Sequence, residues 1–169
     1  MSRPNPSEYL EHQEKFVRLV RGESLAEVIK NHSQEALDFY LSLPEERADY
    51  AYLPEKWTVK ELLQYMIDCE RIITFRILFF ARGEKAVLNP FDENEYARQS
   101  EANRRTLQSL KDEFKAARLS SDLLMLSFSE NQLQKTGLLS GQKVTVNAQC
   151  FSMFGHMLHH KAILEERYL

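Results

Sequence analysis

The hydrophobic residues of this 169-residue chain recur every three or four positions in four long stretches, the spacing of amphipathic helices. No stretch alternates as a strand would, and no segment repeats another. The predicted helices cover residues 24–43, 59–81, 100–128 and 146–168. We expect an all-α fold, a four-helix bundle whose long connections allow a crossover, with short extra helices near residues 8–20, 94–99 and 129–137.

Local sequence signals mark the ends of these helices. Thr58 and Glu61 form a capping box before the second long helix, and Gly83 stops it. We expect residues 138–143 to be a loop and residues 84–93 to be a connection without regular structure that is a candidate pocket lid. Prolines within residues 1–6 oppose an early helix, so this segment is expected to be a disordered or extended lead.

Composition narrows the possible partners. Lys and Arg number 22 against 25 Asp and Glu, which leaves a net charge of −3 and no basic stripe for nucleic acid. No stretch approaches the apolar length of a membrane span, and the N-terminus lacks an apolar signal stretch, so we expect a cytoplasmic protein. The length fits one domain over residues 1–169, and the two cysteines would remain thiols.

Two of the predicted helices carry more apolar surface than one buried face requires. The second long helix has Ile67, Phe75, Leu78 and Phe79 opposite its main stripe. The last helix has a second row of Phe151, Phe154 and Leu158. A second buried surface is most economically a homodimer interface, which is our expectation.

The candidate chemistry lies on the last helix. His156 and His160 are four residues apart, so both imidazoles lie on one helical face. They would bind one metal ion if a third ligand came from another helix and water filled the remaining position. The alternative is that both histidines are simply packed and hydrogen-bonded. The spacing alone does not decide between a metal site and this arrangement.

Several motifs together resemble one known family. They are Lys56-Trp57-Thr58-Val59-Lys60-Glu61-Leu62-Leu63, Ile67-Asp68-Cys69-Glu70-Arg71, Phe91-Asp92-Glu93 and Gly155-His156-Met157-Leu158-His159-His160. In this order they resemble the DinB/YfiT-like family over nearly the whole chain. The resemblance implies an up-down-down-up four-helix bundle, often homodimeric, in which three histidines from two helices hold zinc or nickel. It also implies a metal-dependent hydrolase, or an enzyme that uses a low-molecular-weight thiol such as bacillithiol or mycothiol.

The chain departs from the family at the third ligand. Tyr65 stands where the family's second helix carries its histidine, and Asn89-Pro90 replaces a Pro-Gly pair. Three outcomes stay open. A metal binds through His156, His160 and a substitute, which is Tyr65 itself or, better suited, Cys69; or Tyr65 hydrogen-bonds to an imidazole in a metal-free polar pocket; or the fold serves association alone.

The sequence thus supports two functions. One is a metal-dependent hydrolase or thiol transferase with its site between the second and fourth long helices, acting on an unidentified small molecule. There the ion would activate a water or hold a cosubstrate thiolate, and Asp68, Glu70 and Asp92 are the carboxylates to consider as general bases. The other is a non-catalytic dimeric bundle that binds a small molecule or a partner and has lost its metal.

Overall fold

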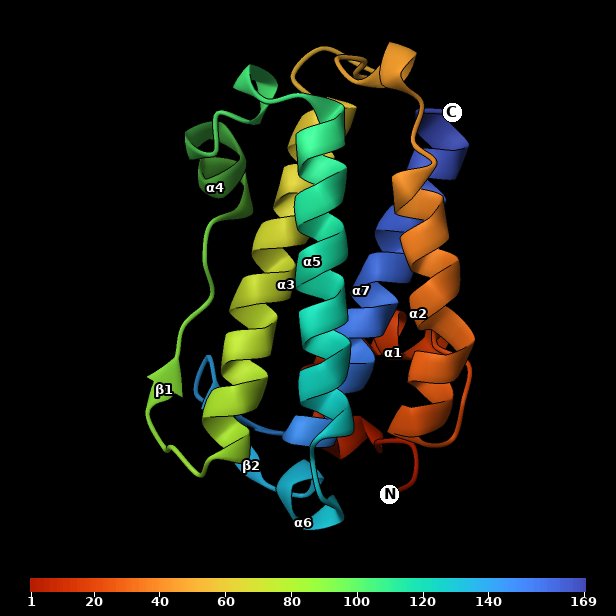
Figure 1. The fold of residues 1–169 in the computed structure, drawn as a ribbon. Coiled ribbons are helices and arrows are strands. Elements are labelled where there is room, and N and C mark those ends of the chain that lie inside the picture. The colour runs from red at the N-terminus through yellow and green to blue at the C-terminus, as the bar shows by residue number, and fades with distance from the viewer.

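The computed structural model describes residues 1–169, and four long helices form its body (Figure 1). Helices α2 and α7 run in one direction and α3 and α5 in the other, which is the expected up-down-down-up connectivity. The helices are α1 (Glu14–Leu19), α2 (Leu25–Leu41), α3 (Val59–Ala81), α4 (Glu93–Gln99), α5 (Leu107–Leu126), α6 (Glu130–Leu133) and α7 (Val146–Arg167). Single 3-10 turns lie at Pro6–Glu8, Glu11–Gln13, Glu45–Arg47 and Ala102–Arg104. No helix combines the length and the apolarity needed to cross a membrane.

Helix α3 begins and ends where its local signals predict. The Thr58 hydroxyl accepts a hydrogen bond from the Glu61 N–H at 3.2 Å, and the Glu61 carboxylate accepts one from the Thr58 N–H at 2.8 Å. Gly83, which follows the helix, has a φ of 91°. Because these contacts lie within one turn, the sequence alone determines the two ends of this helix.

Two helix starts differ from the prediction. The third long helix begins at Leu107 rather than at residue 100, because Glu101 is left-handed at φ 48° and Thr106 supplies the cap. The first short helix begins at Glu14, since Leu10 is extended and only a 3-10 turn follows it. Both predicted starts were therefore too early.

The expectation of no strands was wrong. The chain forms a small sheet of order β1 (Val87–Leu88), β2 (Thr136–Leu139) and β3 (Gln142–Thr145), with β1 parallel and β3 antiparallel to β2. Ser140 and Gly141 make the hairpin turn, with φ values of 52° and 77°. The predicted loop at 138–143 is thus mostly a hairpin, and the connection at 84–93 adds a strand to it.

Residues 1–6 pack against the bundle instead of forming a disordered lead. The Arg3 guanidinium donates hydrogen bonds to the carbonyls of Val17 and Val20 at 2.5 and 2.8 Å. The Asn147 side-chain amide donates to the Ser2 carbonyl at 2.9 Å. These bonds satisfy the C-terminal carbonyls of α1 and hold that short helix against α7.

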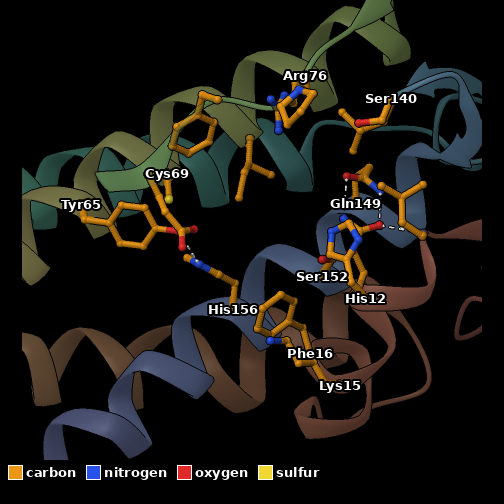
Figure 2. A pocket seen from close by; sticks show the side chains of 17 residues that line it. His12, Lys15, Phe16, Tyr65, Cys69, Arg76, Ser140, Gln149, Ser152 and His156 are labelled. Atoms are coloured by element: carbon orange, nitrogen blue, oxygen red, sulfur yellow. Dashed lines mark hydrogen bonds between the residues drawn. The ribbon is translucent and has the colours of Figure 1, made fainter. Parts of the chain in front are cut away.

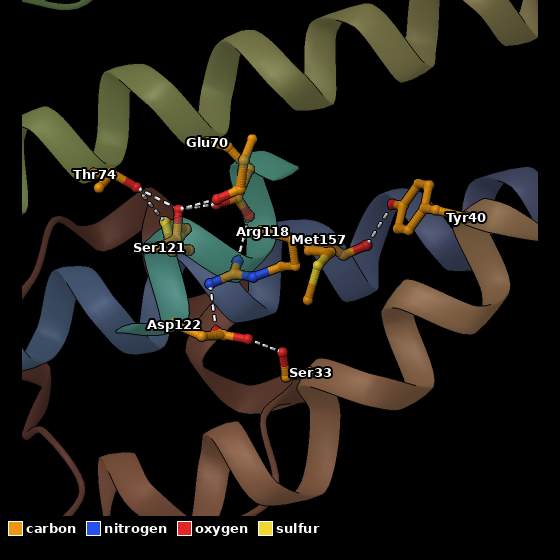
Figure 3. Close-up of polar contacts among 10 residues, drawn as sticks. Ser33, Tyr40, Glu70, Thr74, Arg118, Ser121, Asp122 and Met157 are labelled. Carbon is orange, nitrogen blue, oxygen red and sulfur yellow. Dashed lines mark hydrogen bonds and ion pairs between the residues drawn. The ribbon is translucent and has the colours of Figure 1, made fainter. Parts of the chain in front are cut away.

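An ion-pair network crosses the centre of the bundle (Figure 3). The fully buried Arg118 guanidinium of α5 pairs with Glu70 of α3 and, at 2.8 Å, with Asp122. Ser121 donates to Glu70 at 2.7 Å, and Ser33 of α2 donates to Asp122. Each charge has a partner, so the network ties three helices into one register.

The apolar rows that predicted a dimer are largely covered within the single chain. Ile67, Phe151 and Phe154 have no exposed surface, whereas Phe75 is 55% exposed. Three of the apolar residues that stay exposed lie on α5, where Leu119, Leu123 and Leu126 are 46%, 71% and 58% exposed. The homodimer stays a prediction, and this α5 stripe is the surface on which it now depends.

Candidate functional site

Helix α7 positions the two histidines. Thr145 caps the helix by accepting a hydrogen bond from the Ala148 N–H at 3.1 Å. The spacing of four residues then places the His156 and His160 rings 4.6 Å apart, centroid to centroid, on the face toward α3. Both imidazoles therefore lie inside the bundle, as the sequence predicted.

Tyr65 of α3 faces both imidazoles. Its Oη is 3.2 Å from Nε2 of His156, and its ring centroid is 5.6 Å from the His156 ring and 5.4 Å from the His160 ring (Figure 2). The Trp57 ring packs against the phenol ring, with the ring centroids 4.8 Å apart. Of the three arrangements that the sequence left open, this geometry is that of the phenol hydrogen-bonded to an imidazole.

Burial keeps this group of residues uncharged at neutral pH. Burial and then the neighbouring His160 lower the pKa of His156 well below its usual value, and burial lowers the pKa of His160 to about 4. Burial raises the pKa of Tyr65, and the nearby Cys69 and Glu93 raise it further. The Tyr65 phenol and the His156 imidazole are thus both neutral, and their hydrogen bond contains one proton. The phenol donates to Nε2 when His156 carries its own proton on Nδ1.

Cys69 lies one turn beyond Tyr65 and is also a poor ligand. Its side chain is buried, and burial raises the pKa of its thiol to about 12. A cysteine binds a metal as its thiolate, and the raised pKa of Cys69 disfavours that form. No three His, Cys, Asp or Glu side chains anywhere in the chain converge as a metal-holding group. The residues present therefore do not fit the zinc or nickel site that the resemblance implies.

The three candidate carboxylates lie apart from this group. Asp68 accepts a hydrogen bond from Gln64 at 3.0 Å and lines another depression, beside Arg71. Glu70 lies in the central ion-pair network, and Arg71 pairs with Glu113 instead. Asp92 caps α4 by accepting from the Asn94 and Glu95 N–H groups, each at 3.0 Å. The structure thus gives each of them a structural contact.

A pocket of about 300 Å³ opens beside the Tyr65–His156 pair (Figure 2). Helices α1, α3 and α7, the β2–β3 turn and the 90–93 segment form its walls, so part of the predicted lid does line a pocket. Sequence reasoning missed most of its lining, including Phe16, Arg76, Gln149, Ser152 and Glu93. His160 opens instead on a smaller pocket of about 210 Å³ under Trp57.

Gly155 allows α1 to form the pocket wall. A Cβ atom at this position would overlap the backbone carbonyl of Phe16. The absence of a side chain lets α1 lie directly on α7, which places the Phe16 ring edge-on to His156 with centroids 5.3 Å apart.

A helical face explains why these residues meet. Tyr65, Cys69, Ile73 and Arg76 are spaced by four, four and three residues on α3, and all line the pocket. Gln149, Ser152 and His156 of α7 follow the same rule. The sequence therefore contained a sign of the missed lining: extending the stripe that starts at Tyr65 leads to Arg76.

No protein-family model matches the sequence, and no curated protein matches it. The fold is nevertheless shared with solved structures. YfiT from Bacillus subtilis, a probable metal-dependent hydrolase with an unusual four-helix bundle topology, matches 96% of this chain and 89% of its own at 15% identity and a TM-score of 0.69. The DinB-like protein YjoA from Bacillus subtilis matches 83% of this chain and 86% of its own at 15% identity and a TM-score of 0.59.

A third match is the mycothiol-dependent maleylpyruvate isomerase. It covers 89% of this chain, which spans 59% of the isomerase, at 14% identity and a TM-score of 0.63. At such identities the likeness shows the fold, and the function has to be argued from the site.

Proposed function

We propose that this chain, which shares the fold of YfiT and the DinB-like proteins, is a metal-independent small-molecule-binding protein. Its ligand would occupy the pocket between α1, α3 and α7, beside the hydrogen-bonded Tyr65 and His156. The observation that carries the proposal is the 3.2 Å contact between Tyr65 Oη and His156 Nε2. That nitrogen already has a protein partner, so it is not free to bind an ion.

The chemistry of the donors supports the same conclusion. Structural and catalytic zinc sites take three or four ligands, and thiols and phenols must lose a proton to bind. Here the thiol pKa is about 12 and the phenol pKa is raised by burial. A metal would have to remove a proton from one of these buried groups, as well as break the hydrogen bond to His156.

Binding, rather than turnover, is what the protonation states favour. A general base works best with a pKa near the operating pH, but the pKa of His156 is far below that value and the pKa of Tyr65 is above it. Cys69 and Cys150 both have pKa values raised to about 12, so neither is a ready nucleophile. The pair is suited to donating and accepting hydrogen bonds with a bound molecule.

A second function is suggested by the two inward imidazoles. Both are neutral, which is the form that binds metals, and their rings are 4.6 Å apart. With a zinc or nickel ion and a rearranged Tyr65, the site would suit hydrolysis, for which YfiT is the described example. It would also suit chemistry that depends on a low-molecular-weight thiol, and the isomerase is described as mycothiol-dependent. Metal content separates the two functions.

The test is elemental analysis of protein purified without a metal-affinity tag, followed by thermal unfolding with and without added zinc or nickel. We expect far less than one equivalent of metal and no rise in the melting temperature, because only a ligand of the folded state stabilises it. Near-stoichiometric metal, together with an upward shift that a chelator reverses, would overturn the proposal in favour of the metalloenzyme.

A further inference from the structure

Arg76 of α3 is a half-buried cation that lacks an anionic partner. Its guanidinium donates one hydrogen bond, to the Asn89 carbonyl at 2.7 Å, and lies 5.8 Å from the centroid of the Phe91 ring. No carboxylate forms an ion pair with it, although a guanidinium carries five N–H donors. The pocket wall thus presents donors that nothing in the chain uses.

The contrast with Arg118 shows how unusual this is. The same bundle gives Arg118 two carboxylates, Glu70 and Asp122, because a buried charge without a partner is costly. Arg76 receives none, and burial lowers the pKa of its guanidinium. Burial disfavours the charged form of the guanidinium, and an anion that binds beside it stabilises that form again.

The charges around the pocket point the same way. Lys15 of α1 also lines it, and its ammonium lies 4.8 Å from the Phe16 ring with no carboxylate paired to it. Figure 2 shows Lys15 and Arg76 on opposite sides of the pocket. The single lining carboxylate, Glu93, lies toward the other end, where it raises the pKa of Tyr65 and Cys69. Apart from Glu93, the formally charged side chains of the pocket are therefore two cations, Arg76 on one wall and Lys15 on the opposite wall.

The remaining walls divide into an apolar part and a neutral polar part. Phe16, Ile73, Phe91 and Leu139 offer hydrocarbon surface, and Ser152 of α7 adds a hydroxyl group. Gln13 and Gln149 hydrogen-bond to each other at 3.1 and 3.2 Å, so their amides are already partly satisfied. A volume of about 300 Å³ is at the small end for organic ligands.

We propose that the pocket binds a small organic carboxylate, whose carboxylate group pairs with the Arg76 guanidinium while its hydrocarbon part lies between Phe16, Ile73 and Phe91. A planar guanidinium matches a carboxylate through two parallel hydrogen bonds. Lys15, on the opposite wall, would add long-range attraction for the anion. This inference rests on the proposed function, because the ligand enters the same metal-free pocket.

The test uses benzoate and hexanoate as probes, with benzamide, hexanamide and inorganic phosphate for comparison. Binding to the full chain is followed by two-dimensional NMR of the isotope-labelled protein. We expect the carboxylates to shift the Phe16 and Ser152 amide signals and to bind at least about tenfold more tightly than the amides, a difference of about 1.4 kcal/mol. Equal binding of acids and amides, or equal binding of phosphate, would refute the assignment of a carboxylate.

Variants then locate the charge. Arg76→Gln should weaken benzoate binding about tenfold or more, and Arg76→Lys should restore part of it, because the charge remains but the two-pronged geometry is lost. Arg82→Gln is the matched control, since Arg82 follows α3 and lies outside the pocket. Unchanged benzoate affinity in Arg76→Gln would overturn the proposal. If Arg76→Gln fails to fold, the comparison of acids with amides on the natural protein still decides.

The two proposals fail in different ways. If benzoate binds only after zinc is added and a chelator abolishes it, the metal-independent function is wrong. If benzoate fails to bind while the protein proves metal-free, the carboxylate assignment is wrong and the proposed function stands.

Discussion

Replacing Tyr65 with histidine should create a metal site in this bundle. The Tyr65 ring is nearly equidistant from the two imidazoles, at 5.6 and 5.4 Å, so a histidine at position 65 would place a third imidazole beside them. The substitution also removes the phenol that occupies His156 Nε2. Three neutral imidazoles with water in the fourth position form a known zinc arrangement.

The size of the effect follows from linkage. Zinc at about 100 times its dissociation constant adds about 2.7 kcal/mol to the free energy of unfolding. For a chain of this length, each kcal/mol raises the melting temperature by about 2–4 °C, so zinc should raise that of Tyr65→His by about 5–11 °C. Comparing one variant with and without zinc cancels the cost of losing the buried phenol and its packing on Trp57.

Thermal unfolding by circular dichroism, paired with elemental analysis, measures both quantities. Tyr65→Phe is the control that keeps the ring without adding a ligand, and Tyr65→His combined with His160→Ala should lose the zinc shift. If Tyr65→His gains no shift and no metal, the three side chains do not converge as the ring distances indicate. A shift of equal size in the natural protein would instead refute its metal-independent function.

Four further predictions follow from the contacts of single residues. The pKa of His160 is about 4 in the folded chain against about 6.5 in the unfolded chain, so the unfolded state takes up a proton first as the pH falls. The free energy of unfolding should therefore be unaffected by His160 above about pH 6.5 and should fall by on the order of 3 kcal/mol as the pH is lowered to 4. Urea unfolding across this range should show a smaller loss in His160→Asn. Gly155→Ala should destabilise by about 1–3 kcal/mol and weaken benzoate binding, because its methyl group pushes α1 and Phe16 away, and unchanged NMR signals from α1 would contradict this. Arg118→Met should cost about 3–5 kcal/mol in urea unfolding, since it leaves Glu70 buried without its cation, and a loss below 1 kcal/mol would contradict the network's role. If the homodimer forms through the α5 stripe, Leu123→Glu should give a monomeric mass in light scattering where the natural protein gives a dimer, and a natural protein that is already monomeric would end that expectation.

The parts of the fold that sequence predicted are those fixed by neighbours within one turn. The Thr58–Glu61 box and Gly83 set the ends of α3 without reference to any other element. The start of α5 was missed because it depends on Glu101, which adopts a left-handed conformation. Glutamate has no particular preference for that conformation, so the sequence does not indicate it. A prediction from helix propensity alone therefore placed the start of α5 too early in the chain.

The hairpin was missed although its turn carries a signal. Ser140-Gly141 is a two-residue connection between short segments that pair in register, which is how hairpins are recognised. Strands β2 and β3 are only four residues long, so neither shows a clear alternation of polar and apolar residues. Strand β1 comes from a distant part of the chain. Pairing across a sequence separation of about 50 residues is a tertiary effect that local patterns do not contain.

The candidate site divides along the same line. The histidine pair and Tyr65 were predicted because each lies on a helix whose face the periodicity defines. Arg76 lies three turns further along the Tyr65 face, but a stripe of apolar residues gave no reason to follow it to a cation. What was missing was the knowledge that no carboxylate would approach it, and that absence is visible only after α4 and the 90–93 segment are in place.

The two ends of the pocket differ in charge, and this difference links the proposed metal-independent function to the proposed ligand. At one end Tyr65 and His156 satisfy each other and stay neutral, so they contribute hydrogen bonds but no net charge. At the other end Arg76 keeps its charge without a partner. A bundle that held a metal cation between its histidines would add a further positive centre to Arg76 and Lys15 in the same small space. With the phenol in place of the third imidazole, the half-buried Arg76 guanidinium is the charge that we expect to select which molecules bind.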